Sequence, residues 1–113
     1  MEQLEKLIST ITTEYKKGSL TLAVLSQLNV PRYGYSLLQH LEEKGIYIET
    51  STLYPLLRRL EKQGVLKSEW DTQESKPRKY YILSDLGIEL YKIVSKEWII
   101  LAQQMQNILE EEK

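Results

Sequence analysis

A short central stretch of the sequence is rich in basic side chains. Positions 54–81 hold seven basic and four acidic residues, a local balance of +3, although the whole chain carries a net charge of -1. The basic residues are Arg58, Arg59, Lys62, Lys67, Lys76, Arg78 and Lys79. Positions 1–53 hold five basic and six acidic side chains, and positions 82–113 hold three and six. A site that binds a polyanion needs a basic region of this kind. A cluster of basic residues can also be an ordinary solvated surface, so the charge by itself does not decide between the two.

Cysteine and histidine, on which much catalysis and metal binding depends, are scarce. The chain has no cysteine and one histidine, His40, on a leucine-bearing segment. This excludes thiolate chemistry and cysteine-ligated metal sites, and it leaves a histidine-based site without partners. The glycines occur singly, so the sequence predicts no phosphate-binding loop. We therefore expect no catalytic residue, no metal site and no cofactor.

The length and hydropathy of the chain predict a single small soluble domain. It has 113 residues, of which 42% are hydrophobic and 27% charged, enough for one core but not for two. Apolar runs are only a few residues long, and the first residues are charged, so we expect neither a membrane span nor a signal peptide. The absence of cysteine is compatible with a reducing cytoplasm.

One predicted helix, from about residue 52 to Gly64, separates leucines from polar residues. At 100° per residue the leucines fall on one side, which we expect to face the core: Leu53, Leu56, Leu57 and Leu60. The opposite side carries Ser51, Pro55, Arg58 and Lys62, with Tyr54 and Arg59 at its edges. Hydroxyls at the amino end and cations behind them suit a DNA groove, but spacing alone favours a solvated face equally. Pro55 is expected in the first turn.

A predicted β hairpin follows this helix. Residues 65–72 and 78–83 are rich in β-forming side chains and flank a polar turn. Lys76, Arg78 and Lys79 lie in or just after that turn and should reach outward. Together with the preceding basic helix, they predict a two-point grip on a nucleic-acid duplex.

Glycine and proline divide the rest of the chain. A helix over residues 2–17 should end at Gly18, and a second, capped by Ser19, should cover residues 20–28 in the middle of the core. A third helix is predicted over residues 33–44, with Tyr35, Leu38 and Leu41 buried and Gly45 as its carboxyl cap. Residues 46–48 form a β-prone link, and Ser84 should cap a last helix that reaches almost to the end.

The two terminal helices carry apolar stripes that a small domain has little room to bury. The last helix repeats at spacings of three and four, a heptad seam made of Tyr91, Val94, Trp98, Leu101, Met105 and Ile108. The first helix carries Leu4, Ile8, Ile11 and Tyr15. Dimerisation would bury both stripes, and the alternative is that the two helices pack on one another within a monomer.

The predicted fold is mainly α with a small β hairpin. It is a winged helix-turn-helix with an extra N-terminal helix and a long C-terminal dimerisation helix. We expect residues 1–83 to form the DNA-binding domain and residues 84–113 to form a dimerisation helix of the same compact unit.

Three motifs across nearly the whole chain carry a family resemblance. They are Tyr33-Gly34-Tyr35, the segment TLYPLLRRLEKQG at 52–64, and Arg78-Lys79-Tyr80-Tyr81, with Ser84-Asp85-Leu86-Gly87 similar to the usual turn into the last helix. Together they resemble PadR-type transcriptional regulators of the short branch that lacks a separate C-terminal domain. Lys76-Pro77 departs from the family, because many members have glycine there.

This resemblance implies a cytoplasmic homodimeric repressor that binds an inverted repeat in double-stranded DNA. The DNA contacts expected on this chain are Tyr33, Tyr35, Ser51, Thr52, Tyr54, Arg58, Lys62, Lys76, Arg78 and Lys79. In multidrug-binding members a tryptophan of the last helix sandwiches planar aromatic effectors, and Trp98 stands at that place, with Val94 and Leu101 beside it. Plain dimer packing of Trp98 is the alternative. A winged-helix module used only for protein association is the alternative function.

Overall fold

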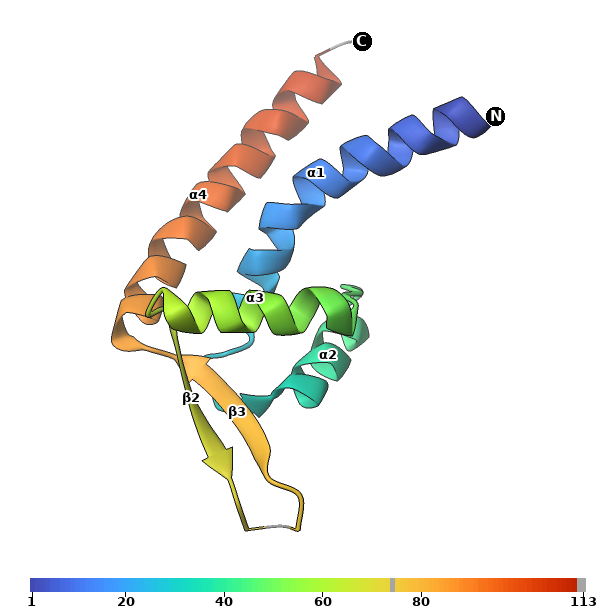
Figure 1. Ribbon diagram of the computed structural model, residues 1–113. Helices are drawn as coiled ribbons and strands as arrows, with labels where there is room; N and C mark the ends of the chain where they lie inside the picture. Colours follow the sequence, from blue (N-terminus) through green and yellow to red (C-terminus); the bar gives the residue numbers. More distant parts are fainter. Residues whose placement is uncertain (74, 112–113) are drawn as a thin grey trace.

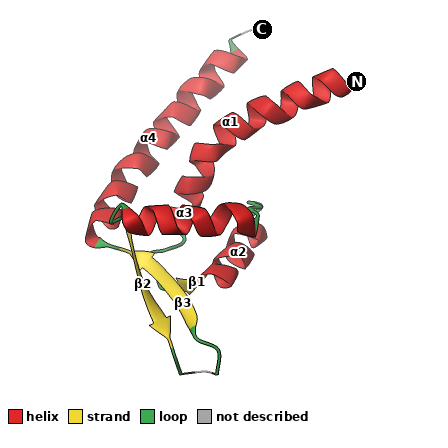
Figure 2. Cartoon of the chain, in the orientation of Figure 1, coloured by secondary structure: helices red, strands yellow, loops and turns green. Residues whose placement is uncertain are grey.

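The computed structural model describes residues 1–73 and 75–111 of the chain. Glu74, which belongs to the predicted hairpin turn, and residues 112–113, at the end of the predicted segment 84–113, lie outside the described residues. The elements in chain order are α1 (Glu2–Ser26), β1 (Arg32–Tyr33), α2 (Gly34–Glu43), α3 (Thr50–Lys62), β2 (Leu66–Asp71), β3 (Arg78–Leu83) and α4 (Asp85–Glu110). The predicted mainly helical winged fold is confirmed (Figure 2).

The hairpin β2–β3 forms the wing, and the short strand β1 widens it into an antiparallel sheet of order β1-β3-β2. In Figure 1 the wing extends to one side of α3, while the free ends of α1 and α4 extend to the other. The sequence did not predict β1, because two residues are too few for a recognisable alternation. Residues 46–48, predicted as β-prone, form no strand, and Ile48 is buried in the core.

The first two predicted helices are one helix, so the prediction of a break at Gly18 is wrong. Nothing lies within 4 Å of the position a Cβ would take at Gly18, and the hydroxyl of Ser19 donates to the carbonyl of Tyr15 at 3.2 Å instead of capping a new helix. One glycine inside a helix costs about 1 kcal/mol relative to alanine. That cost is small for a 25-residue helix whose far end buries Val24 and Leu25.

Leucines make up most of the core, which lies where α1, α2, α3 and the base of the wing meet. The buried residues are Val24, Leu25, Leu28, Leu37, Leu41, Ile48, Leu53, Leu56, Leu57, Leu60, Val65, Leu66, Tyr81 and Leu83. All four leucines predicted for the inner face of α3 are buried, as expected. On α2 the prediction for Tyr35 is wrong: this helix buries Gly34, Leu37 and Leu41, and Tyr35 is 68% exposed.

Glycine and serine residues end or cap the helices, largely as predicted. Gly45 and Gly64 have φ of +89° and +81°, and each ends a helix as predicted, because glycine adopts this left-handed conformation without strain. Ser84 caps α4 by accepting a hydrogen bond from the amide of Gly87 at 3.0 Å.

Pro55 lies in the second turn of α3, so its predicted first-turn position is wrong. Pro55 cannot donate to the carbonyl of Ser51, but both residues are exposed, so water can replace that bond.

Among the described helices, none is both long enough and apolar enough to cross a bilayer.

We expect Gly87→Ala to destabilise the protein, because an added Cβ would lie 2.1 Å from the carbonyl oxygen of Val65, a backbone atom that cannot move cheaply. The loss should be about 2 kcal/mol or more. Gly18→Ala is the matched control and should stabilise by about 1 kcal/mol, since its Cβ meets nothing. Urea unfolding at one fixed protein concentration measures both. An unchanged midpoint for Gly87→Ala would contradict this packing.

Candidate nucleic-acid interface

Helix α3 presents its cations to solvent because its leucines occupy the core. Leu53 and Leu57 are fully buried, whereas Arg58 and Lys62, one turn apart on the opposite side, are exposed. Ser51 and Thr52, also exposed, lie in the first turn, whose backbone amides have few helical partners. The hydroxyl of Ser51 donates to the carboxylate of Glu49 at 3.5 Å. This exposed side of α3 can place hydroxyls, amides and cations against a polyanion.

Tyr54 lies at the edge of α3, between this exposed side and the core. Its ring packs against the backbone of Gly34 at the start of α2, where an added Cβ would lie 2.6 Å from a ring carbon. The ring is therefore half-buried between the two helices. This contact explains why glycine stands between the tyrosines of Tyr33-Gly34-Tyr35. It also leaves only part of Tyr54 available to a ligand.

Tyr35 is the exposed tyrosine of that motif. It lines a hollow of about 340 Å³ that also includes Tyr47, Glu49 and Thr50, at the start of α3. The structure therefore brings Tyr35 close to the amino end of α3.

Tyr33 connects strand β1 to the wing. Its hydroxyl donates to the carboxylate of Asp71 at 2.5 Å, and its ring lies edge-on to Tyr80 with a centroid distance of 6.0 Å. The guanidinium of Arg78 lies 4.3 Å from the centre of the Tyr33 ring. The Tyr33 hydrogen bond, assisted by the backbone amide of Gln73, holds the pKa of Asp71 below its usual 3.8. Tyr33 and Arg78, both predicted DNA contacts, thus also support the wing.

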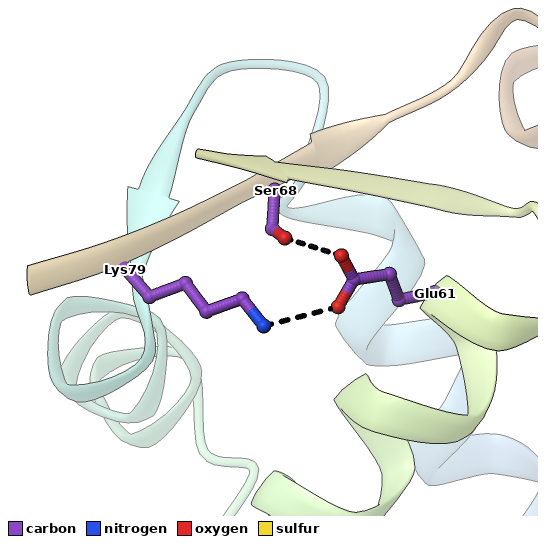
Figure 3. A network of polar contacts seen from close by, with 3 residues as sticks. All are labelled: Glu61, Ser68 and Lys79. Carbon is purple, nitrogen blue, oxygen red and sulfur yellow. Dashed lines mark hydrogen bonds and ion pairs between the residues drawn. The ribbon is translucent and has the colours of Figure 1, made fainter. Parts of the chain in front are cut away.

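Lys79 does not reach outward as the sequence suggested. Its ammonium forms an ion pair with the carboxylate of Glu61 at 3.2 Å, and the same carboxylate accepts a hydrogen bond from the hydroxyl of Ser68 (Figure 3). The Ser68 hydrogen bond and then the Lys79 charge lower the pKa of Glu61 from its usual 4.5. The other wing cation, Lys76, is exposed. A helix, β2 and β3 therefore meet at one carboxylate.

Sequence reasoning missed Glu61 and Ser68. The register places Ser68 opposite Tyr81, and Trp70 opposite Lys79, which puts all four on one face of the hairpin. Lys79 and Tyr81 share this face by alternation along β3 alone, whereas only the register shows that Ser68 lies beside them. The sequence alone does not fix that register, because the turn length is ambiguous.

The predicted dimerisation residues lie on the two helical arms that extend from the core (Figure 1). Tyr91 and Val94 are half-buried, whereas the other eight positions are about half exposed: Leu4, Ile8, Ile11, Tyr15, Trp98, Leu101, Met105 and Ile108. The arms contact where the indole nitrogen of Trp98 donates to the hydroxyl of Ser19 at 3.4 Å. Beyond that contact they diverge, so packing within the chain leaves both stripes uncovered.

Trp98 lies beside several hollows on these arms. One of about 740 Å³ lies between α1 and α4 and is lined by Tyr15, Ser19, Trp98 and Met105 among others. Another, of about 530 Å³, brings together the three residues predicted to bind an effector: Val94, Trp98 and Leu101. Trp98 is 45% exposed. In the part of the chain that is described, no cluster of three or more metal-ligating side chains occurs.

Comparison with known proteins agrees with this geometry. Residues 21–93 match the model of the transcriptional regulator PadR-like family. The chain is similar to the crystal structure of a PadR family transcriptional regulator from Eggerthella lenta, with 44% identity over 97% of this chain and 98% of that one, and a TM-score of 0.87. A transcriptional regulator from Clostridium thermocellum matches with 30% identity over 83% and 93% of the two chains and a TM-score of 0.75.

A curated relative, an uncharacterised protein of Lysinibacillus sphaericus, is 33% identical over 93 residues, which cover 78% of this chain and 85% of that protein. The match to the family model includes α2, α3 and the whole wing, and the exposed cations Arg58, Lys62, Lys76 and Arg78 lie on α3 and the wing. The chain therefore belongs to the PadR-like family of transcriptional regulators, and it has the winged-helix fold of that family.

Proposed function

We propose that this protein is a homodimeric repressor that binds an inverted repeat in double-stranded DNA and is released by a planar aromatic ligand. The observation that carries the proposal is the exposed pair Arg58 and Lys62 on α3, opposite its buried leucines and beside a basic wing. The protein would act in the cytoplasm, where promoter DNA is accessible.

In this proposal α3 enters the major groove. Arg58 and Lys62 are long enough to reach base edges or phosphates, and the first turn, with Ser51 and Thr52, offers hydroxyls and amides to the backbone. Tyr35 and the exposed part of Tyr54 lie beside that turn and would contact the flanking sugar and phosphate groups.

The wing would hold the neighbouring backbone. Lys76 at its tip and Arg78 in β3 are both exposed. Their contacts with phosphates would be independent of sequence and would weaken with salt. Tyr33 would act mainly by fixing the Arg78 guanidinium against its ring.

The apolar arms support a dimer. Four residues of α1 and the four seam residues of α4 from Trp98 to Ile108 remain exposed in one chain, and contiguous exposed apolar surface often marks a protein interface. A twofold axis through these arms would present two copies of α3 to half-sites separated by about one helical turn of DNA, or a multiple of it.

Release by a ligand would follow from the place of Trp98 on the same arms. Two Trp98 indoles facing across the axis could hold a flat aromatic cation, with stacking and cation-π attraction of about 0.5–2 kcal/mol per contact. A ligand that prefers a wider dimer would change the spacing of the two α3 helices. Its effect on operator affinity is limited by that preference.

For DNA binding, we expect Arg58→Ala with Lys62→Ala to weaken binding at least tenfold to duplexes selected from a random pool by the wild-type protein. Removal of each phosphate contact should also lower the salt slope by about one. Lys16→Ala with Lys17→Ala, which removes the same charge from α1, is the control and should bind as the wild type does. If the wild type selects no duplex, the protein is instead an association module.

For the dimer, light scattering at micromolar concentration should give about twice the chain mass of 13.3 kDa. Leu101→Glu with Met105→Glu should give a monomer of lower unfolding temperature, because carboxylates would have to be buried in the seam. Lys96→Glu changes the charge of α4 outside the seam and should remain dimeric. A wild-type monomer whose unfolding is independent of concentration would refute the assembly.

For the ligand, a planar aromatic cationic dye should quench the fluorescence of the Trp70→Phe variant, in which Trp98 is the reporter. The Trp98→Phe variant reports from Trp70 on the wing and should not respond. The same dye should reduce operator affinity of the Trp70→Phe protein only. Equal responses of the two variants, or none, would assign Trp98 to dimer packing alone.

A further inference from the structure

The carboxylate of Glu61 bridges three elements of the DNA-binding unit. Glu61 belongs to the last turn of α3, Ser68 to β2 and Lys79 to β3 (Figure 3). One carboxylate oxygen accepts the Ser68 hydroxyl, and the other receives the Lys79 ammonium at 3.2 Å. Each oxygen of the Glu61 carboxylate therefore contacts a different strand of the wing. We call these three residues the Glu61 bridge.

The surroundings of the bridge favour a fixed geometry. The side chains of Lys79 and Glu61 are only 31% and 34% exposed, less than an ordinary surface ion pair. The Lys79 ammonium also lies 5.4 Å from the ring centre of Tyr81, which is part of the core, and 5.9 Å from that of Trp70. The Ser68 hydrogen bond and the Lys79 charge favour the ionised carboxylate, and they lower the pKa of Glu61. The Lys79 charge is thus satisfied within the protein.

The outer part of the wing is joined to the helices by the Glu61 bridge at α3 and by Tyr33, at the start of α2, which contacts Asp71 and Arg78. Leu66 at the base of β2 and Tyr81 and Leu83 of β3 are buried, but from Glu69 to Arg78 the described residues are half-buried or exposed. The angle between the wing and α3 determines whether both can contact the same duplex at once. The Glu61 bridge contacts the wing at Ser68 and Lys79, beyond its buried base, so it can influence that angle.

We propose that Glu61 is a positioning residue for DNA binding: through Ser68 and Lys79 it sets the angle of the wing to α3, and Lys79 serves this bridge and not the DNA backbone. This inference rests on the proposed function. It replaces the sequence-based role of Lys79, and it assigns the phosphate contacts of the wing to Lys76 and Arg78.

The double variant Glu61→Gln with Lys79→Met tests the proposal, because it removes the bridge and leaves the net charge unchanged. Its affinity for the selected duplex should fall by about three- to tenfold while the salt slope stays that of the wild type. Lys79→Arg keeps the ion pair and should bind normally. Lys76→Met is the matched lysine control, and its salt slope should fall by about one.

Two results would overturn the proposal. A salt slope that falls by about one in the single variant Lys79→Met would make Lys79 a phosphate contact. Wild-type affinity in the charge-neutral double variant would show that the bridge does not influence the wing.

Hydrogen exchange without DNA separates this proposal from the proposed function. The amides of β2 and β3 should exchange about threefold faster or more in the double variant than in the wild type, while those of α2 stay unchanged. Faster exchange together with no DNA binding by the wild type would refute the proposed function but keep the bridge as a structural device. Unchanged exchange would refute the bridge itself.

Discussion

Burial of the leucine face of α3 is the constraint on which the rest of the structure depends. Leu53 and Leu57 have no exposed surface, and Leu56 and Leu60 have almost none. Since these side chains are separated by three or four residues, their burial fixes the rotation of the helix. Arg58 and Lys62 must then face solvent, while Tyr54 and Glu61 fall at the edge that meets α2 and the wing. One apolar stripe thereby decides which side chains can meet DNA.

Other contacts hold the neighbouring elements in place around α3. Gly34 lets the Tyr54 ring lie directly on α2, and Gly87 lets α4 begin against the backbone of Val65. Tyr33, Asp71 and Arg78 hold β1 to the wing, and the Glu61 bridge holds the wing to α3. The arms formed by α1 and α4 extend from the same core that α3 packs against. That continuity is what regulation by a ligand at Trp98 would require.

The sequence predicted the features that depend on periodicity and on local caps. The leucine stripe of α3, the caps at Gly45, Gly64 and Ser84, and the hairpin all depend on residues close together in the chain. The sequence-based predictions were wrong where the rest of the helix outweighed the conformational preference of a single residue. Gly18 did not break α1, since continuous hydrogen bonds and core packing outweigh the preference of one glycine, and Pro55 was tolerated on a solvated side.

The features that the sequence did not predict depend on how strands far apart in the chain pair with one another. Strand β1 exists only because Arg32 and Tyr33 pair with Tyr81 and Tyr80, nearly fifty residues away. The partner of Lys79 became visible only once β2 and β3 were in register beside α3. A list of basic residues therefore predicted a candidate interface, but not that Lys79 pairs with Glu61 inside the protein.

In the proposed function, α3 and the wing bind the same DNA duplex together. Amide exchange of the full-length protein with and without the duplex it selects from a random pool tests this most directly. We expect new protection in the first turns of α3 and at the wing around Lys76 and Arg78, with no loss of protection in α1 or α4. Protection confined to the helical arms, or to α3 without the wing, would contradict it.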